Sequence, residues 1–405
     1  MVGKSCDADT KRLRNIGRIQ SCGFCLALQD DAACPSGLRI SSVSDNVAQA
    51  HWIQSSSDAR TFIGKDLGLM FHADCVETVR SLVARQEQTR TPRADRVCAN
   101  VNRNTADIRP FRKVHGELLL PSTDQGEKVE VWTCTVASSN LGVYLLEMEQ
   151  NNHREPETCL LKVAHLLSRI PSEATPKAIT PALGDALGES LPAYDRIMIY
   201  RFREDKTGEV IHESIRSGFK TSSSYLNLRF PATDIPPEAR ELLQLNGVRF
   251  ITDTSDPGVP LILEERVSTP LDLSMSAFRA PTECHLGYLR NMGVRASLVV
   301  AIVVDGRLWG LCSCHSYTRP VHPSCEERLM AGMATAITAS LISYRQRGDI
   351  ATTAVSLSGT LDKLGGHARV SDFLLAEHKP LMSTLRVDTV VLCERSRHIT
   401  VYGNK

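Results

Sequence analysis

The residues with the clearest capacity for chemistry are a cysteine and a histidine that stand side by side. Cys284-His285 follows a proline-containing stretch without periodicity and opens a segment with helical spacing. The amino end of a helix lowers the pKa of a thiol through its dipole and free amides, and so favours the nucleophilic thiolate. Neighbouring helix residues point about 100° apart, which makes His285 a poor general base for Cys284. The pair therefore leaves two interpretations of Cys284 open, a functional thiol and a structural cysteine, and it disfavours a hydrolytic dyad.

Two other cysteine groupings are better explained as strand residues. Cys22-x-x-Cys25 has the spacing of half a zinc site or of a redox pair, but no second pair follows at ligand spacing. In Cys312-x-Cys314-His315, strand alternation places both cysteines on one face and the histidine on the other. The odd total of 13 cysteines, with no secretory signal at the start, favours reduced thiols over a disulfide framework.

Length and charge exclude several classes of function. At roughly 100 to 200 residues per domain, 405 residues predict two or three domains. The balance of 47 Lys and Arg against 46 Asp and Glu lacks the basic excess of a nucleic-acid binder. The longest apolar run, residues 296–304, is too short to span a bilayer. We therefore expect a cytoplasmic protein without nucleic-acid or membrane partners.

The first part of the chain must supply a sheet, because its apolar residues alternate with polar ones. Residues 16–150 predict an antiparallel sheet with a few helices. A capping box at Asp74 and Glu77 predicts a helix that ends near Arg90. The expected strands are 19–29, 37–43, 113–120, 128–136 and 142–148.

The second part contains the elements that must position Cys284. After a polar junction at 149–157, the expected helices are 158–169, 236–247 and 285–292, and the expected strands are 195–202, 209–213, 297–304 and 308–314. Pro236-Pro237 begins one helix and Gly247 ends it. Residues 250–280 lack periodicity, and a long irregular loop inside a domain is usually functional.

The last predicted elements form a long helix and a short tail. A capping box at Ser324 and Glu327 predicts a helix to about Arg347, with an apolar stripe that suits pairing in a homodimer. The stripe consists of Leu329, Met330, Met333, Ile337 and Leu341. Residues 348–405 predict one helical segment and a hairpin of 389–393 with 399–402, which is too little for a complete third domain.

Four segments, in order, resemble the chromophore-binding region of phytochromes. They are YDRIMIYRF at 194–202, FPATDIP at 230–236, RAPTECHLGYLRNMGV at 279–294 and GRLWGL at 306–311. The resemblance implies an α+β protein in which each domain is an antiparallel sheet flanked by helices. It implies an N-terminal extension at 1–15, a PAS domain at 16–150, a GAF bilin-binding domain at 151–347 and a partial PHY-like segment at 348–405. It also implies that loop 250–279 encircles the segment around Ile19 as a figure-of-eight knot.

The same resemblance implies a red/far-red photoreceptor that holds a linear tetrapyrrole, a bilin, and signals by its photoisomerisation. Cys284 would form a thioether with the A ring, while the Asp234 carbonyl and His285 would hold the inner ring nitrogens. The bilin propionates would lie near Arg249, Arg279 and Ser297. The D ring would face His315 and be walled by Tyr200, Phe230 and Tyr288.

The sequence departs from the family pattern at its amino end. Ser21-Cys22 replaces the usual Pro-x before Gly23, and Ser316 stands where bacterial members carry a second histidine. Cys6 lies near the N-terminal cysteine to which bacterial members attach biliverdin, so it competes with Cys284. Attachment through Cys284 favours phycocyanobilin or phytochromobilin, whereas attachment through Cys6 favours biliverdin.

Alternatives from other classes remain at this point. A GAF module that senses a small ligand, or a dimerisation scaffold without chromophore, would leave Cys284 inert. An enzyme is disfavoured, because no base is placed for Cys284 and no phosphate-binding glycine motif precedes a helix. The tail ends before the tongue hairpin of a PHY domain and no kinase segment follows, so we expect incomplete or unstable photoconversion.

Overall fold

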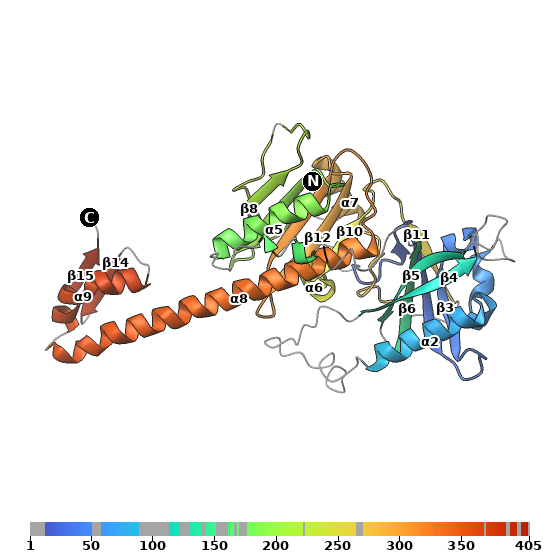
Figure 1. The fold of residues 1–405 in the computed structure, drawn as a ribbon, viewed down its shortest axis with the longest axis horizontal. Coiled ribbons are helices and arrows are strands. Elements are labelled where there is room, and N and C mark those ends of the chain that lie inside the picture. Colours follow the sequence, from blue (N-terminus) through green and yellow to red (C-terminus); the bar gives the residue numbers. More distant parts are fainter. Residues whose placement is uncertain are drawn as a thin grey trace. The chain divides into compact units, whose positions relative to one another are not determined.

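The structure is a computed structural model, and the residues that it describes are 13–50, 58–88, 113–121, 129–139, 142–150, 161, 163–165, 168–169, 176–221, 223–264, 270–367, 370–385, 389–394 and 398–403. The chain divides into two compact units, Met1–Ala339 and Ser340–Lys405. Figure 1 shows the ribbon with the elements labelled. None of the helices within these described ranges is long and apolar enough to cross a membrane.

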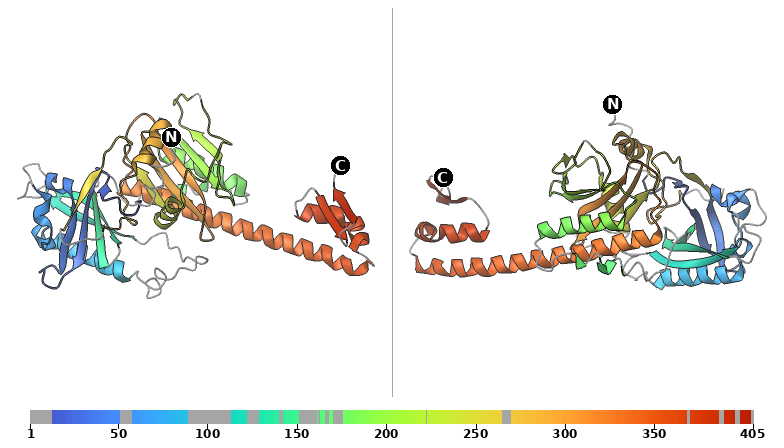
Figure 2. Two further views of the ribbon diagram at one scale, coloured as in Figure 1. Left: turned by 180° about the vertical axis from the view of Figure 1, so that it is seen from behind. Right: turned by 45° about the horizontal axis from the view of Figure 1, so that its top comes forward.

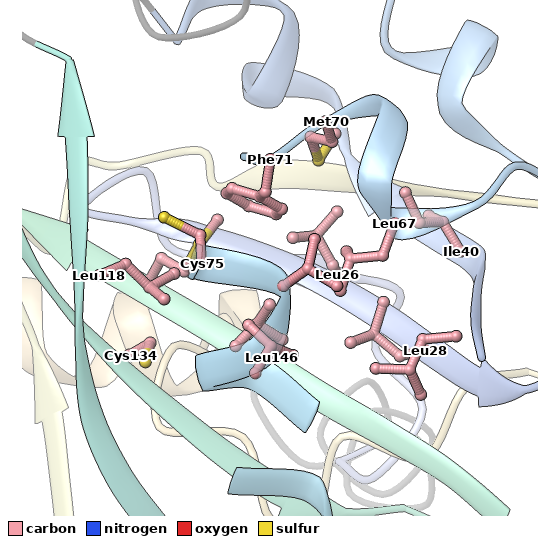
Figure 3. Packing of buried hydrophobic residues seen from close by; sticks show 14 of the residues in the cluster. Leu26, Leu28, Ile40, Leu67, Met70, Phe71, Cys75, Leu118, Cys134 and Leu146 are labelled. Carbon is pink, nitrogen blue, oxygen red and sulfur yellow. The ribbon is translucent and has the colours of Figure 1, made fainter. Parts of the chain in front are cut away.

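The first unit contains a seven-stranded antiparallel sheet in the order β1-β11-β3-β2-β6-β5-β4. Its strands are β1 Arg18–Ile19, β2 Phe24–Asp30, β3 Leu38–Ser44, β4 Lys113–Pro121, β5 Val129–Ser138, β6 Val143–Gln150 and β11 Val259–Leu263. Its helices are η1 Asp45–Gln49, η2 Ala59–Phe62, η3 Leu67–Leu69 and α2 Ala73–Gln88. Alternate strand residues such as Leu26 and Leu146 form the core together with Phe71 and Cys75, as Figure 3 shows.

The same unit contains a second antiparallel sheet in the order β10-β12-β13-β7-β8-β9. Its strands are β7 Arg196–Phe202, β8 Gly208–Ile215, β9 Arg229–Phe230, β10 Val248–Ile251, β12 Ala296–Val304 and β13 Arg307–Ser316. Its helices are α5 Pro176–Ser190, α6 Pro237–Asn246 and α7 Glu283–Asn291. Helix α5 packs against β7 and β8, and α6 packs against β10, β12 and β13. The expected α+β class is confirmed.

The two sheets interlock through loop 250–279. Strand β11, yellow in Figures 1 and 2, comes from this loop but pairs with β1 and β3 of the first sheet. On the other arm of the loop, the Phe278 carbonyl accepts a hydrogen bond from Gln20 N (2.7 Å), and Ala280 N donates to the Arg18 carbonyl (3.0 Å). The segment around Ile19 therefore lies between the two arms of the loop, as the knot prediction requires.

The second unit begins inside helix α8, Cys325–Leu361. Its other elements are η5 Asp362–Gly366, α9 Val370–Leu385, β14 Thr389–Glu394 and β15 His398–Gly403. Helix α9 packs against the hairpin of β14 and β15 and buries Phe373, Leu374 and Leu381. The hairpin predicted at 389–402 is confirmed.

Local signals predicted several element ends correctly. Helix α6 begins at Pro237 and ends before Gly247, whose φ is 73°. The capping box of α8 is complete, because Ser324 N donates to Glu327 Oε2 (2.9 Å) and Glu327 N donates to Ser324 Oγ (3.1 Å). However, α8 continues to Leu361 instead of ending near Arg347, so the predicted GAF boundary falls inside a helix.

Other expectations about elements were wrong. The strand expected at 19–29 is two strands, because a turn at 21–23 separates β1 from β2. Helix α2 begins at Ala73, so Asp74 lies inside the helix instead of capping it. Helix α5 was missed because Pro181 lies within it. Strands β10 and β11 were missed because they are short and pair with distant partners. Half of the helix expected at 158–169 lies outside the described residues.

Candidate functional site

Helix α7 places Cys284 and His285 in its first turn. The N-cap is Thr282, whose hydroxyl accepts a hydrogen bond from His285 N (3.4 Å). The expected position at a helix start is therefore confirmed. Cys284 is disulfide-bonded, whereas the cysteines that are free are Cys22, Cys25, Cys34, Cys75, Cys134, Cys312, Cys314 and Cys325. This corrects the expectation of reduced thiols only, and it means that Cys284 becomes a nucleophile only after reduction.

Of the cysteines in the two groupings, Cys25, Cys312 and Cys314 are buried and Cys22 is partly buried. Burial is the main cause that raises the pKa of Cys22 to about 12 and raises that of Cys25. The pKa of Cys314 is also raised, first by its hydrogen bond with Cys312 and then by burial. No metal-binding group of His, Cys, Asp or Glu occurs among the described residues. Cys25, Cys312 and Cys314 are strand residues as predicted, whereas Cys22 lies in the turn at 21–23 between β1 and β2.

Two aromatic residues predicted to wall the D ring lie together on one side of the second sheet. The Tyr200 and Phe230 rings are 6.0 Å apart, on β7 and β9, the two strands on either side of β8. Burial, and then the nearby Asp234 carboxylate, raise the pKa of Tyr200 to about 12, so its hydroxyl stays protonated. Gly208 makes room for this ring, because a Cβ there would lie 1.7 Å from Tyr200 Cζ.

Asp234 faces helix α7 from the segment before α6. The Tyr288 hydroxyl donates a hydrogen bond to Asp234 Oδ2 (3.3 Å), and the Tyr288 ring lies parallel to the His285 ring at 6.4 Å. The structure thus brings Asp234, Tyr288 and His285 together. Asp234 does not cap α6. The N-cap of this helix is Pro236, and no side chain forms a capping hydrogen bond there.

His315 and Ser297 occupy paired positions on β13 and β12, and both are buried. Burial first, and then Arg196 and His285, lower the pKa of His315 to about 4, so the ring is neutral at pH 7. Its Nδ1 atom is buried without a hydrogen-bond partner among the described residues. An orphaned buried nitrogen is costly, so this atom marks a position where a ligand acceptor or donor fits.

Arg249 and Arg279 place two guanidinium groups beside His285. Arg249 Nη1 donates to the Ala277 carbonyl (3.3 Å), and Arg279 Nη1 donates to the Leu13 carbonyl (2.7 Å). Burial, and then Arg279, lower the pKa of Arg249; burial, and then Arg14, lower that of Arg279 to about 10. Arg279 Nε is buried and has no partner within the described ranges. Two adjacent cations of this kind suit an anionic ligand.

The same cations influence His285. His285 is exposed to solvent on its outer side, while protein atoms surround the rest of its ring. Desolvation, and then Arg249 and Arg279, lower its pKa to about 4. His285 is therefore neutral at pH 7 and able to accept as well as donate a hydrogen bond.

A buried arginine beside His315 was missed by sequence reasoning. Arg196 is 2% exposed, lies between the rings of Tyr225 (4.4 Å) and Tyr317 (5.3 Å), and pairs with Glu213 (3.3 Å). The available signal was a charge at the start of the otherwise apolar run that forms β7. It keeps a positive charge near the neutral His315 ring.

Cys6, the competing attachment residue, lies outside the described residues. A cavity of about 390 Å³ lies between the segment around Arg18 and the start of α7. Its lining includes Asp256 and Glu283 but none of the predicted site residues. The candidate site is therefore the group formed by α7, the segment around Asp234, β7, β13 and the two arginines.

Comparisons with known proteins show similarity in sequence and in fold. A family model described as GAF domain matches residues 182–341. A bacteriophytochrome of Xanthomonas campestris is 40% identical over 178 residues, which are 43% of this chain and 27% of that protein. The chain therefore spans about a quarter of the length of that relative.

Two solved structures extend the similarity to both sheets. The chromophore-binding domain of Stigmatella aurantiaca phytochrome P1 is 27% identical with a TM-score of 0.65, over 80% of this chain and 96% of that one. The photosensory core module of Stigmatella aurantiaca phytochrome shares the fold, with a TM-score of 0.74 and 24% identity over 96% of this chain and 70% of that one.

Proposed function

We infer, because the chain belongs to the phytochrome family, that it is a red/far-red photosensory module that covalently binds a bilin. The observation that carries the proposal is the group of unsatisfied polar residues around an aromatic wall. Two guanidinium groups, that of the half-buried Arg249 and that of the buried Arg279, lie near His285, and the buried His315 has an orphaned ring nitrogen among the described residues. We propose the domain boundaries 1–15, 16–150, 151–347 and 348–405 for the extension, PAS, GAF and PHY-like parts.

These residues fit the chemistry of a linear tetrapyrrole. Such a ligand is long, apolar and conjugated, and it carries two carboxylates, four ring nitrogens and terminal carbonyl groups. Arg249 and Arg279, with Ser297 nearby, would bind the carboxylates. Neutral His285 and the Asp234 main chain would hold the inner ring nitrogens. His315 Nδ1 or Nε2 would bond the terminal carbonyl, and Tyr200, Phe230 and Tyr288 would limit the space around that ring.

Reversible photoisomerisation is the chemistry that the bilin supplies when it is bound. The protein responds if its two states differ in interaction free energy with the two ligand shapes. We propose that this difference is felt by the aromatic wall and His315, which surround the ring expected to turn. In this role the chain acts as a receptor and not as an enzyme, and we place it in the cytoplasm.

Cys284 is the proposed attachment residue. Its Sγ would bond to a carbon of the A-ring side-chain double bond, and the thiol proton would go to the neighbouring carbon, so no oxidant is required. The disulfide of Cys284 must first be reduced. Attachment at Cys284 favours phycocyanobilin or phytochromobilin, and attachment at Cys6 favours biliverdin.

Covalent attachment is tested by offering phycocyanobilin and biliverdin to the reduced chain and then denaturing it. We expect retained colour with phycocyanobilin, and its loss in Cys284→Ala but not in Cys6→Ala. Absence of colour with both bilins would instead support a GAF sensor of another small ligand or a dimerisation scaffold. Colour that persists in Cys284→Ala and disappears in Cys6→Ala would overturn the assignment of the cysteine.

We also propose a homodimer through the predicted 324–347 segment of α8. Met330 is buried, so the part of the expected stripe that is available to a partner is Leu329, Met333, Ile337 and Leu341, spaced four residues apart. Ile337 is 40% exposed and Leu341 is 37% exposed. We expect Ile337→Lys to weaken self-association at least tenfold in sedimentation equilibrium, because it places a charge in an apolar contact. An unchanged dissociation constant would exclude this face.

A further inference from the structure

Strand β6 carries two buried carboxylates on the face that points away from the core of its own sheet. Tyr144, Leu146 and Met148 face that core, so the alternate residues Glu147 and Glu149 face the opposite side. Glu147 is only 2% exposed and Glu149 only 5%. Burying a carboxylate costs free energy unless hydrogen-bond donors surround it. Each of these two side chains must therefore bond to donors from another part of the structure.

Glu147 is bonded by three consecutive residues of the loop arm that precedes Arg279. Its Oε2 accepts from Ala277 N (2.9 Å), and its Oε1 accepts from Phe278 N (3.0 Å) and from the Ser276 hydroxyl. A single side chain from the first sheet thus fixes the main chain of residues 276–278. Hydrogen bonds that main-chain amides donate to a carboxylate belong to the stronger class.

Both pocket arginines are connected to residues 276–278, which are called the clamped segment from here on. Arg249 Nη1 donates to the Ala277 carbonyl (3.3 Å), and Arg279 follows Phe278 directly. The Phe278 ring packs edge-on against Phe250, at 6.1 Å and 80°, next to Arg249. The Glu147 charge also favours the protonated form of Arg249. A shift of this segment would therefore move both guanidinium groups.

We propose that Glu147 is a positioning residue, which fixes residues 276–278 so that Arg249 and Arg279 together bind the two carboxylates of the ligand. The proposal rests on the proposed function, since these carboxylates are the bilin propionates. Glu147 itself does not contact the ligand in this account. Its effect should therefore depend on whether the ligand has free carboxylates.

Glu149 provides a matched control on the same strand and face. Its carboxylate accepts hydrogen bonds from Arg328 Nη1 (3.0 Å) and from the ring of His322 (3.0 Å), and among the described residues it accepts none from residues 276–278. Glu149→Gln therefore removes a buried charge from β6 without changing the attachment of residues 276–278. It separates a general effect on stability from an effect on the two arginines.

The test compares binding of phycocyanobilin with that of its dimethyl ester, in which both carboxylates are masked. Because Cys284 is proposed to attach the bilin covalently, the dissociation constant of the preceding reversible step is obtained from the dependence of the attachment rate on bilin concentration. Absorbance follows this rate for the full reduced chain and for Glu147→Gln and Glu149→Gln. We expect the unaltered chain to bind the acid at least tenfold more tightly than the ester. Glu147→Gln should reduce this ratio by about tenfold with little change for the ester, and Glu149→Gln should keep the ratio. Because a charged carboxylate is replaced by an amide that still has one acceptor, the loss is partial.

A folded Glu147→Gln variant with an unchanged ratio would overturn the proposal, and so would an equal fall of the ratio in Glu149→Gln. If Glu147→Gln does not fold, Ser276→Ala removes one of the three donors and should lower the ratio in the same direction; an unchanged ratio there counts against the proposal. Failure of the unaltered chain to bind either form would instead contradict the proposed function. The two kinds of failure are thus distinguishable.

Discussion

At the scale of single residues, His315 combines two unfavourable features in one side chain. Its ring is buried, with Nδ1 unsatisfied within the described ranges, and it lies near the positive charge of Arg196. An unpaired buried polar atom lowers stability, and a ligand that bonds to this atom restores the lost stability. The chain without bilin should therefore be less stable than the loaded chain, and more sensitive to acid.

The first prediction concerns this sensitivity to acid. The pKa of His315 is about 4 when folded, against 6.5 ordinarily, so between these values the unfolded chain binds more protons. Stability should fall as the pH falls through this window, by up to about 3 kcal/mol for this residue. Urea unfolding at pH 7 and pH 4.5 measures the change. His315→Gln should flatten the profile in part, because His285 and His115 have similarly lowered pKa values of about 4. An identical profile in the variant would contradict the assignment.

Gly208 provides a second prediction at this scale. A Cβ at this position would overlap the Tyr200 ring, which packs tightly against Gly208, the first residue of β8. We expect Gly208→Ala to destabilise the chain by about 1–3 kcal/mol and to weaken bilin binding, because Tyr200 must move. Gly287→Ala is the control, since nothing lies within 4 Å of a Cβ there. Equal urea midpoints for the two variants would show that the Tyr200 ring is not fixed in place.

At the scale of elements, β6 and α8 are joined by a buried ion pair. Arg328 bonds the Glu149 carboxylate at the start of α8, packs over the Phe250 ring at 4.8 Å, and is the main partner that lowers the pKa of Glu149 to about 2. The pair joins the strand that holds loop arm 276–278 to the helix that leaves the second sheet. Removing one partner leaves a buried charge unpaired, which costs more than removing both.

This asymmetry gives a third prediction. Arg328→Met should destabilise the chain by about 3–5 kcal/mol in urea unfolding, whereas Arg328→Met combined with Glu149→Leu should recover a large part of the loss. Lys363, which pairs with Glu377 at the surface, supplies the comparison: Lys363→Met should cost less than about 1 kcal/mol. Additive losses in the double variant would contradict a coupled pair.

Local chemistry explains which elements were predictable. Helix α6 and the start of α8 carry their own stop and start residues, namely Gly247 and the Ser324–Glu327 box, so neighbouring positions suffice to place them. Strand β11 carries no such signal, because its partners Ser44 and Arg18 lie more than 200 positions away. The pairing of β11 depends on how the two sheets interlock, and no pattern in the neighbouring sequence predicts this interlock.

The same distinction applies to the candidate site. The motif residues Cys284, His285 and Asp234 were predictable because they lie in contiguous segments that resemble a known family. The bond from Tyr288 to Asp234 and the clamp by Glu147 were not, because each joins parts of the chain that only the fold brings together.

At the scale of the whole molecule, the two sheets of the first unit are connected by loop 250–279 and the segment that passes between its arms. Residues 13–20 lie between the arms of loop 250–279, with bonds from Leu273 N to the Arg14 carbonyl (2.7 Å) and from Leu261 N to the Gly17 carbonyl (3.0 Å). The loop therefore fixes the first sheet to the arm that holds the pocket arginines. A change at the pocket has a direct covalent and hydrogen-bonded path to the first sheet.

The central claim is that this interlocked unit holds a bilin whose isomerisation it senses. The most direct test is the absorbance difference between dark and red-illuminated samples of the reduced full chain, loaded with phycocyanobilin and freed of unbound pigment. We predict a red band that bleaches under red light and recovers in darkness or far-red light, even if conversion is partial. A chain that carries no visible band after gel filtration, with phycocyanobilin and with biliverdin alike, would contradict the account.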